Sequence, residues 1–582
     1  MYFNSRSAEC KAPFGAVRTG QTVRFSVYDA AGPVTLELFA DGASQPALCA
    51  PLTPVGNGAS ASVTAPAAGL YFYRFAVPGG YLTRGEGGCA VLTGSDGQPF
   101  QLTVYDAFET PDSFKGGVMY QIFPDSFCRS GLPKQDIPAD RTMQPLDALP
   151  DNRPDENGRY CTRYYGGDLP GITEKLPYLA SLGVTMLYLN PIFEAHANHR
   201  YNTANYLRID PMLGTEADFT ALCAAARRLG ISVILDGVFN HTGDDSLYFD
   251  KFGRYGHTGA WHNRQSPYRR WYSFHGTGYR GWWGMPTMPE LNENEPSYRQ
   301  FICGEGGVID YWLNRGASGF RLDVADELPD GFIAACRTAV KRHPGCLLIG
   351  EVWEDASNKV AYSVRRRYLL GHELDGVMNY PFRTAILGFL RTGDAAAFAE
   401  AVTGILENYP APVWPLLMNM LSTHDTERII TALAAGRPPH SKQAQREYIL
   451  PREEFLRGLE LVKLAAALQF TLPGFPSVYY GDEIAMQGFG DPFCRAYYRW
   501  DDPPADLRGL MRSLSALRRS QPAFHTGGCR FLLAENGAVA YLREEKDSRV
   551  LVLVNRGEQT AELTIDGRCF RCQPWRTCIE VL

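Results

Sequence analysis

Hydrophobic and polar positions follow two different patterns along the chain, and the change of pattern predicts its domains. Near the N-terminus, apolar side chains occupy every second position, as at Val23, Phe25 and Val27, between closely spaced Gly and Pro clusters. Period-two alternation is typical of strands with one buried face. It predicts a β-sandwich over residues 1–112. The same period-two alternation occurs near the C-terminus and predicts a second, smaller β-sandwich domain over residues 521–582.

The middle of the chain, residues 113–520, alternates short, continuously apolar runs with helical patterns. The runs cover residues 118–123, 184–189, 231–235, 319–322, 346–350, 376–380, 416–420 and 476–480. Continuously apolar runs are typical of parallel strands buried on both faces. Eight such strands with helices between them predict an α/β fold, a (β/α)8 TIM barrel. The segment 240–297, after the third strand, is too long for a simple loop and predicts an inserted subdomain over the barrel mouth.

One stretch without charge, residues 464–481, is long enough to be tested as a membrane span. Two prolines, Pro473 and Pro476, flank Gly474 within it. We therefore interpret the stretch as a helix end, a turn and a buried strand, and we expect no membrane partner. The first 20 residues contain no apolar core of a signal peptide, which predicts a cytoplasmic protein.

Composition narrows the class of function. The chain has 57 basic and 63 acidic residues and a net charge of -6, without a charged tail. This balance lacks the basic footprint of a nucleic-acid-binding protein. Aromatic residues make up 12% of the chain and suit a neutral, ring-shaped ligand. The 14 scattered cysteines favour reduced thiols, and the CxxC pair Cys569 and Cys572 lacks the second pair that a zinc site would need.

Polar and charged side chains follow the apolar runs at the points where a barrel would bring them together. They are Asp236, Asn240, His241, Arg321, Asp323, Glu351, His424 and Asp425. The carboxyl ends of barrel strands meet at one face, and active sites lie there. A structural ion pair would account for any one of these residues. Because buried charges are costly without partners, the whole cluster predicts an active site.

Several carboxylates beside an arginine and histidines suit the cleavage of a glycosidic bond. That reaction needs one carboxylic acid to protonate the leaving oxygen and a second carboxylate to act at the anomeric carbon. A two-metal hydrolase would also use carboxylates and histidines. However, His196 and His199 lack the i,i+4 spacing of a helical zinc site, and we interpret them as part of a polar loop.

Five segments around the cluster resemble the signature regions of the α-amylase family. They are residues 236–241, 288–292, 319–327, 350–353 and 422–425, in the family's order and spacing. The likeness extends from about Val118 to Trp500. With a β domain before the barrel, the chain is most similar to the neopullulanase, cyclomaltodextrinase and maltogenic amylase group.

The resemblance implies a role for each matching residue in a retaining mechanism. Asp323 would be the nucleophile, Glu351 the general acid and base, and Asp425 the residue that stabilises the transition state. Arg321 would keep Asp323 ionised and contribute to substrate binding. The other residues implied to bind substrate are His199, Tyr201, Asp236, His241, Glu327, Trp353 and His424. A retaining outcome corresponds to catalytic carboxyl groups about 5 to 5.5 Å apart.

The inserted segment is rich in aromatic residues. Trp261, Trp271, Trp282 and Trp283 lie close together within it. Aromatic faces suit the apolar faces of sugar rings, but a small subdomain also needs large side chains for its own core. We expect one or two of the four tryptophans to contact sugar.

The chain departs from the family pattern in the calcium loop and at three single positions. Its segment 127–136 keeps few oxygen ligands of the family's calcium loop, although Gly167 and Asp168 remain as candidate ligands. Calcium takes six to eight oxygens, so we expect that no cofactor is required. Departures at Glu290, Asp326 and Glu354 leave the bond preference open.

These observations predict a hydrolase that cleaves α-1,4 bonds in maltodextrins, cyclodextrins, pullulan or starch, with α-1,6 cleavage and transglycosylation as further activities. A glucosyltransferase or sugar isomerase of the same family would use the same catalytic groups. An inactive carbohydrate-binding protein is the alternative of another class. Relatives with this architecture also imply a homodimer formed through the N-terminal domain.

Overall fold

The chain folds into two compact units. The computed structural model describes residues 1–30, 32–134, 137–156 and 158–582. One unit contains residues 1–110 together with 353–376 and 399–414, and the other contains residues 111–352, 377–398 and 415–582. The C-terminal strands thus belong to the same unit as the barrel. The three-domain division expected from the sequence stays a prediction.

The N-terminal part of the first unit consists of two β-sheets. One sheet has the order β1 (Lys11–Ala12), β3 (Thr22–Tyr28), β7 (Gly58–Thr64) and β6 (Thr53–Val55). The other has the order β10 (Ala90–Thr93), β9 (Gly80–Arg84), β8 (Gly69–Val77), β11 (Phe100–Tyr105) and β2 (Val17–Arg18), and β8 also pairs with β4 (Thr35–Ala40), which pairs with β5 (Leu48–Pro51). The alternating residues Val23, Phe25 and Val27 are buried in one hydrophobic core with side chains from the second sheet, such as Tyr73.

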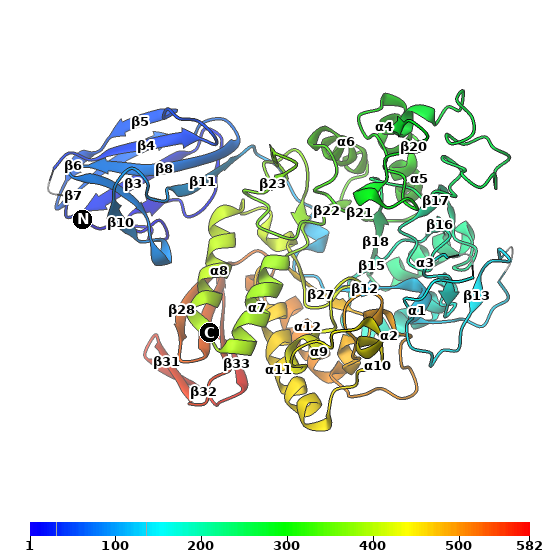
Figure 1. The fold of residues 1–582 in the computed structure, drawn as a ribbon. Coiled ribbons are helices and arrows are strands. Elements are labelled where there is room, and N and C mark those ends of the chain that lie inside the picture. The colour runs from blue at the N-terminus through cyan, green and yellow to red at the C-terminus, as the bar shows by residue number, and fades with distance from the viewer. Residues whose placement is uncertain (31, 135–136, 157) are drawn as a thin grey trace. The chain divides into compact units, whose positions relative to one another are not determined.

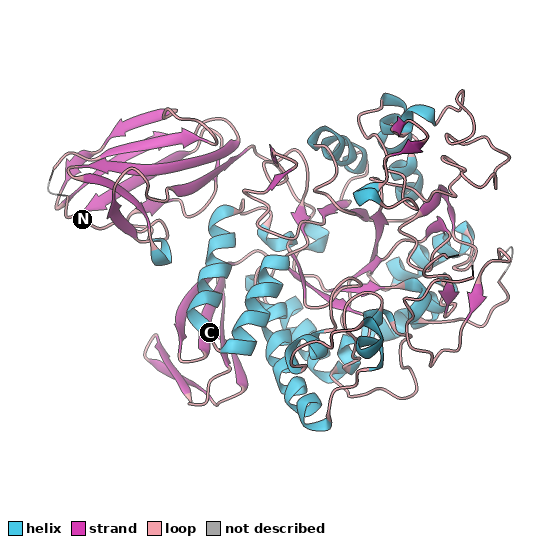
Figure 2. Ribbon diagram, viewed as in Figure 1, coloured by secondary structure: helices cyan, strands magenta, loops and turns pink. Residues whose placement is uncertain are grey.

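The second unit is built around a parallel eight-stranded barrel, which appears as a ring of strands inside a layer of helices (Figure 2). In chain order its strands are β12 (Met119–Ile122), β15 (Met186–Leu189), β18 (Ser232–Gly237), β21 (Gly319–Leu322), β22 (Leu347–Gly350), β25 (Gly376–Val377), β26 (Met418–Met420) and β27 (Phe475–Tyr479). An isolated parallel bridge between Met378 and Met418 joins the two ends of the sheet. The predicted (β/α)8 barrel is therefore confirmed.

The barrel helices begin and end where the sequence provides capping groups. The principal ones are α2 (Leu169–Ser181), α3 (Glu216–Arg228), α6 (Asp330–Lys341), α7 (Tyr380–Thr392), α11 (Arg452–Thr471) and α12 (Arg508–Ser520). Thr215 and Asp218 form a reciprocal capping box at the start of α3. Asn379 accepts a hydrogen bond from Phe382 N and starts α7 directly after the sixth strand.

The stretch 464–481 has the predicted helix, turn and strand. Helix α11 ends at Thr471 and β27 begins at Phe475, so the two prolines lie at the turn and in the strand. Among the described residues, no helix is long and apolar enough to cross a membrane. In the part of the chain that the structure describes, no cysteine forms a disulfide, Cys569 and Cys572 included.

The segment inserted after β18 has little regular structure before α4 (Pro296–Cys303) and α5 (Val308–Asn314). Two of its tryptophans form aromatic packing within the segment. Trp261 lies 5.7 Å from Phe249 between ring centroids, and Trp271 lies 5.1 Å from Tyr298. These two tryptophans therefore pack on neighbouring aromatic rings, as side chains that form the core of the subdomain would.

The chain ends in a four-stranded sheet of order β28 (Gly528–Glu535), β29 (Ala538–Glu545), β30 (Ser548–Asn555) and β33 (Arg576–Val581). The pair β31 (Ala561–Ile565) and β32 (Arg568–Cys572) accompanies it, and all six strands are drawn toward the red end of the colour range (Figure 1). Leu542, Leu551 and Phe570 contribute to a core shared by the two sheets. Two β-rich regions thus flank the barrel in sequence.

Candidate active site

Barrel register brings the predicted charged residues together at the carboxyl ends of three neighbouring strands. Asp236 in β18 lies opposite Arg321 in β21, and Leu322 lies opposite Gly350 at the end of β22. The next residue after each of the last two is a carboxylate, Asp323 and Glu351. Both carboxylates are buried, with 5% of each residue exposed.

Arg321 is the centre of this cluster. Its Nη1 donates to Asp236 Oδ1 and to Asp323 Oδ1, both at 2.7 Å, and its Nη2 lies 2.9 Å from Glu351 Oε2. The planar, always charged guanidinium can hold several carboxylates in fixed directions, which a flexible ammonium group cannot do as well. Arg321 therefore fixes the relative positions of Asp323 and Glu351.

One guanidinium cannot neutralise three carboxylates, and this imbalance decides the charge of the cluster. Burial raises the pKa of Asp323 well above its usual range, and the charges of Glu351 and Asp236 raise it further, whereas Arg321 opposes them. Because the groups interact strongly, the raised pKa belongs to the cluster as a whole. The single positive charge of Arg321 therefore only partly offsets the burial of Asp323.

Val324 directs a backbone donor at Glu351. It has a φ of +41°, a conformation that is costly for a β-branched residue. In this conformation its N–H donates to Glu351 Oε2 at 2.7 Å. Since Arg321 approaches the same oxygen, Oε2 acts as an acceptor, and a proton carried by this carboxyl group belongs on Oε1.

Asp236 supports the cluster from its buried side and does not face solvent. Tyr188 and Tyr201 donate their hydroxyl protons to its Oδ2 at 2.7 and 2.8 Å, while Arg321 binds Oδ1. The Asp236 side chain has 0% exposure. This geometry fits a residue that positions Arg321 and Tyr201 better than one that touches sugar.

His424 connects Tyr201 to Asp425. Gln121 Nε2 lies 3.0 Å from His424 Nδ1, and an amide nitrogen only donates, so Nδ1 accepts and Nε2 carries the proton. His424 Nε2 then faces Tyr201 Oη and lies 3.1 Å from Asp425 Oδ2. The imidazole ring stacks on the ring of Tyr201. Burial lowers the pKa of His424 well below its usual value, so the imidazole is a neutral donor.

The other two predicted histidines are also neutral. Burial lowers the pKa of His241 to about 4 and that of His199 to about 3. His199 Nδ1 accepts a hydrogen bond from Tyr201 N at 3.0 Å and so orients the tyrosine backbone. In the described part of the chain, His241 Nε2 is buried without a hydrogen-bond partner, so it retains its capacity to bind a hydroxyl group.

Arg495 is a site residue that the sequence reasoning missed. Its Nε donates to the His424 carbonyl oxygen at 2.8 Å, and its Nη2 lies 3.5 Å from Asp425 Oδ1. Its Nη1 is paired with Asp491 Oδ1 at 2.7 Å. Burial raises the pKa of Asp425 to about 7 and Glu351 adds to the rise, while Arg495 opposes it. The i,i+4 pair after the eighth strand was the available signal.

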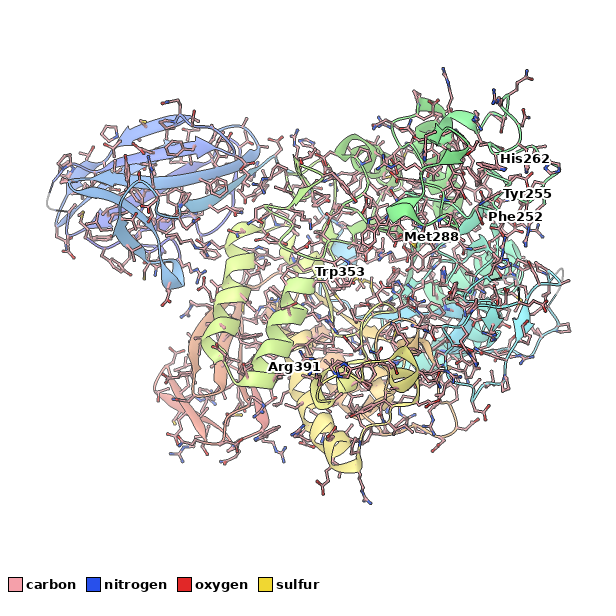
Figure 3. All side chains as sticks on the ribbon, in the orientation of Figure 1. Phe252, Tyr255, His262, Met288, Trp353 and Arg391 are labelled. Atoms are coloured by element: carbon pink, nitrogen blue, oxygen red, sulfur yellow. The ribbon has the colours of Figure 1, made fainter. Side chains whose placement is uncertain are left out.

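Glu327 and Trp353 are the remaining predicted substrate-binding positions. Glu327 Oε1 accepts a hydrogen bond from Trp283 Nε1 at 3.0 Å. Trp353, labelled in Figure 3, is 48% exposed and belongs to the first compact unit. Its predicted role in substrate binding stays a prediction.

The candidate calcium ligands do not fit a calcium ion. Asp168 caps α2, and its Oδ2 binds the ammonium group of Lys134 at 2.7 Å. The same ammonium donates to the Met212 carbonyl oxygen at 2.8 Å, so a protein cation already occupies the place between these oxygens. Within residues 1–30, 32–134, 137–156 and 158–582, no group of three or more His, Cys, Asp or Glu side chains could hold a metal. Residues 135 and 136 of the predicted loop lie outside the described residues.

Comparisons with known proteins agree with this geometry. Residues 121–502 match the family model described as alpha amylase, catalytic domain. The chain is 36% identical to an amylopullulanase of Thermoanaerobacter thermohydrosulfuricus over 83% of this chain and 36% of that protein. It is 34% identical to neopullulanase 2 of Thermoactinomyces vulgaris over 79% of this chain and 72% of that protein.

A solved structure is also similar. The cyclic α-maltosyl-(1→6)-maltose hydrolase of Arthrobacter globiformis has a TM-score of 0.69 and 31% identity, covering 81% of this chain and 99% of that one. The chain spans less than half of the length of the amylopullulanases that it matches, 36%, 48% and 33% of three of them.

Proposed function

The chain belongs to the α-amylase family, and on that premise we propose that it is a retaining hydrolase of α-glucans that cleaves α-1,4 and α-1,6 glucosidic bonds. The observation that carries the proposal is the cluster of Arg321 with Asp323 and Glu351, in which one guanidinium holds two carboxylates at 2.7 and 2.9 Å. Two carboxyl groups held on one scaffold are what a retaining glycosidase needs.

In the first step, Asp323 attacks the anomeric carbon of the bound sugar. The bond to the leaving oxygen breaks, Glu351 gives its proton to that oxygen, and a covalent glycosyl ester of Asp323 forms. Arg321 stabilises the carboxylate before attack and keeps it directed at the carbon.

In the second step, the deprotonated Glu351 takes a proton from a water molecule. The resulting hydroxyl attacks the same carbon, the ester bond to Asp323 breaks, and the sugar leaves with its original configuration. Two inversions therefore give retention. The donors on Glu351 Oε2, from Arg321 and Val324, suit both stages because they stabilise the carboxylate between the two proton transfers.

Asp425 and the histidines hold the sugar during both steps. His424 Nε2 lies 3.1 Å from Asp425 Oδ2, and this carboxylate can accept hydrogen bonds from sugar hydroxyl groups. His241 offers an unpaired ring nitrogen. Hydrogen bonds to hydroxyl groups that strengthen in the transition state accelerate the reaction.

Relatives support a substrate range with both bond types. The similar proteins include amylopullulanases, a neopullulanase and a cyclomaltodextrinase, whose names cover linear, branched and cyclic glucans. We accordingly propose maltodextrins, cyclodextrins, pullulan and starch as substrates for this chain. Cytoplasmic location and a homodimer through residues 1–112 stay predictions from the sequence.

Product analysis tests the proposal. The full chain is incubated with β-cyclodextrin, pullulan and soluble starch, beside the folded variant Asp323→Asn. We expect products from all three substrates with the α configuration retained, and loss of turnover in the variant by at least about 10³-fold. Absence of turnover by the folded wild-type protein, or inverted products, would contradict the proposal.

A further inference from the structure

Two buried cysteines of the second compact unit face each other. Cys303 is the last residue of α4, Cys336 lies in the middle of α6, and these two helices, both green in Figure 1, pack together. Their sulfur atoms are 3.6 Å apart, and 6% of Cys303 and 0% of Cys336 are exposed. At this distance the two thiols are in van der Waals contact, so no other group separates them.

This contact differs from the surroundings of the CxxC pair near the C-terminus. Cys569 is exposed and Cys572 is buried, three positions apart on β32, so their side chains point to opposite faces of the strand. The Cys572 thiol donates to the Arg576 carbonyl oxygen at 3.1 Å. The thiols of Cys303 and Cys336 instead have each other as hydrogen-bond partner.

An arginine fixes the ends of the two helices against each other. Arg342, the residue directly after α6, donates from Nη2 to the carbonyl oxygens of Cys303 and Gly304 at 2.9 and 3.0 Å. Its Nε lies 3.2 Å from both oxygens of the Asp310 carboxylate, which keeps the guanidinium in place. The end of α4 is therefore bound to the end of α6, and the backbone of the fold holds the two thiols face to face.

One thiol of the pair adjoins a pocket that a small molecule can enter. Cys303, Arg299 and Gln300 are among the residues that line a surface pocket of about 350 Å³. Burial raises the pKa of Cys336 well above its usual value, and the contact with Cys303 raises it further, so Cys336 keeps its proton and can donate it to Cys303 Sγ. A donated hydrogen bond and a nearby arginine both favour a thiolate. Cys303 is therefore the thiol that reacts first.

We propose that Cys303 and Cys336 are a redox-active dithiol that a peroxide converts to a disulfide. The Cys303 thiolate attacks one oxygen of hydrogen peroxide, the O–O bond breaks, and hydroxide leaves and takes up a proton, which gives a sulfenic acid and water. The Cys336 sulfur then attacks the Cys303 sulfur, the S–O bond breaks, and a second water leaves with the Cys336 proton. The two sulfurs lose two electrons to the peroxide, and they approach by about 1.6 Å to reach disulfide length. This inference does not rest on the proposed hydrolase function.

The new bond closes a loop that contains the catalytic strand. The two cysteines are 33 positions apart, and α5 and β21 with Arg321, followed by Asp323, lie between them. A cross-link between the ends of a loop removes conformations from the unfolded chain. Oxidation therefore stabilises the segment that holds the predicted nucleophile, and a reducing thiol reverses the effect.

Oxidation of the full wild-type chain tests the proposal and needs no variant to fold. The protein is treated with a small excess of hydrogen peroxide, free thiols are blocked, and the chain is digested without reduction for mass spectrometry. We expect a cross-linked peptide pair that joins Cys303 to Cys336 and that dithiothreitol separates. The Tm should rise by about 4 °C on oxidation and fall back on reduction. Free thiols at both positions, or sulfinic and sulfonic acids without a cross-link, would overturn the proposal.

Three variants separate the roles of the two thiols. Cys336→Ala removes the second thiol, so peroxide should leave a sulfenic acid at Cys303 that dimedone traps, without a rise in Tm. Cys303→Ala should leave Cys336 unlabelled. Cys223→Ala, at a buried cysteine of α3, should keep both the cross-link and the rise in Tm. Dimedone labelling of Cys336 in Cys303→Ala as strong as that of Cys303 in Cys336→Ala would contradict Cys303 as the thiol that reacts first.

Discussion

At the scale of single residues, Arg495 controls how Asp425 titrates. The pKa of Asp425 is about 7 because burial and Glu351 outweigh Arg495. A carboxyl group whose folded pKa exceeds its unfolded value of about 3.9 keeps its proton in the folded state between these values. It therefore makes the folded state less stable as pH rises from about 4 to 7.

We predict that Arg495→Gln moves the acid limb of the pH profile of kcat/KM to higher pH. Loss of the guanidinium raises the pKa of Asp425 further. Asp425 must be ionised to accept hydrogen bonds from sugar hydroxyl groups. Arg495→Lys should keep most of the limb in place, and Arg499→Gln, at a half-exposed arginine paired with Asp502, should leave it unchanged. A limb at the same pH in wild type and Arg495→Gln would show that Asp425 does not set it.

At the scale of elements, the sequence predicted the barrel better than the ends of its strands. All eight apolar runs overlap a barrel strand, because burial on both faces demands such runs. The run 376–380 gives only a two-residue strand, since Asn379 caps α7. The run 416–420 begins in a 3-10 helix that ends at Leu416. Capping and turns are local choices that hydrophobic pattern alone does not resolve.

Site residues could be predicted where a charged side chain ends an apolar run. They could not be predicted where the polar atom belongs to a residue within the run. Asp323 and Glu351 could be found as strand ends. Tyr188 and Gln121 could not, because they lie within apolar runs and only the register reveals that they bind Asp236 and His424. Arg495 was missed because its partner His424 is distant in sequence.

An ion pair between Lys134 and Asp168 connects the helix α2 to the loop before it. We predict that chelators and added Ca²⁺ leave the Tm unchanged, since Lys134 already binds Asp168 and the Met212 carbonyl oxygen. Lys134→Met should lower stability by about 3 kcal/mol, because the Asp168 side chain, 4% exposed, then lacks its cation. Thermal unfolding followed by circular dichroism measures both effects. Lys463→Met, at an exposed lysine, is the matched control, and a Tm that falls on chelation would contradict the prediction.

At the scale of the whole molecule, one buried arginine stabilises the barrel itself and a second joins the C-terminal sheet to it. Arg518 in α12 donates to the carbonyl oxygens of Gly117, Phe470 and Gly474, which precede strands or end a helix of the barrel. Arg543 in β29 donates to the carbonyl oxygen of Thr471, at the end of α11, and to two carbonyl oxygens beside its own sheet, those of Gly527 and Gly528. Buried carbonyl groups that lose their donors are costly, so these contacts couple the folding of sheet and barrel.

We predict that Arg543→Met lowers the free energy of unfolding of the barrel together with that of the C-terminal sheet, by about 3 kcal/mol for three carbonyl groups that lose a donor. Both parts lie in one compact unit, so calorimetry should show them unfolding in one transition that moves to lower temperature as a whole. Arg530→Met, on the neighbouring strand at a side chain 63% exposed, should leave this transition in place. A new, separate transition for the C-terminal strands in Arg543→Met, with the barrel transition unmoved, would mean that residues 521–582 fold as an independent domain, and the sequence-based division would then be the better description.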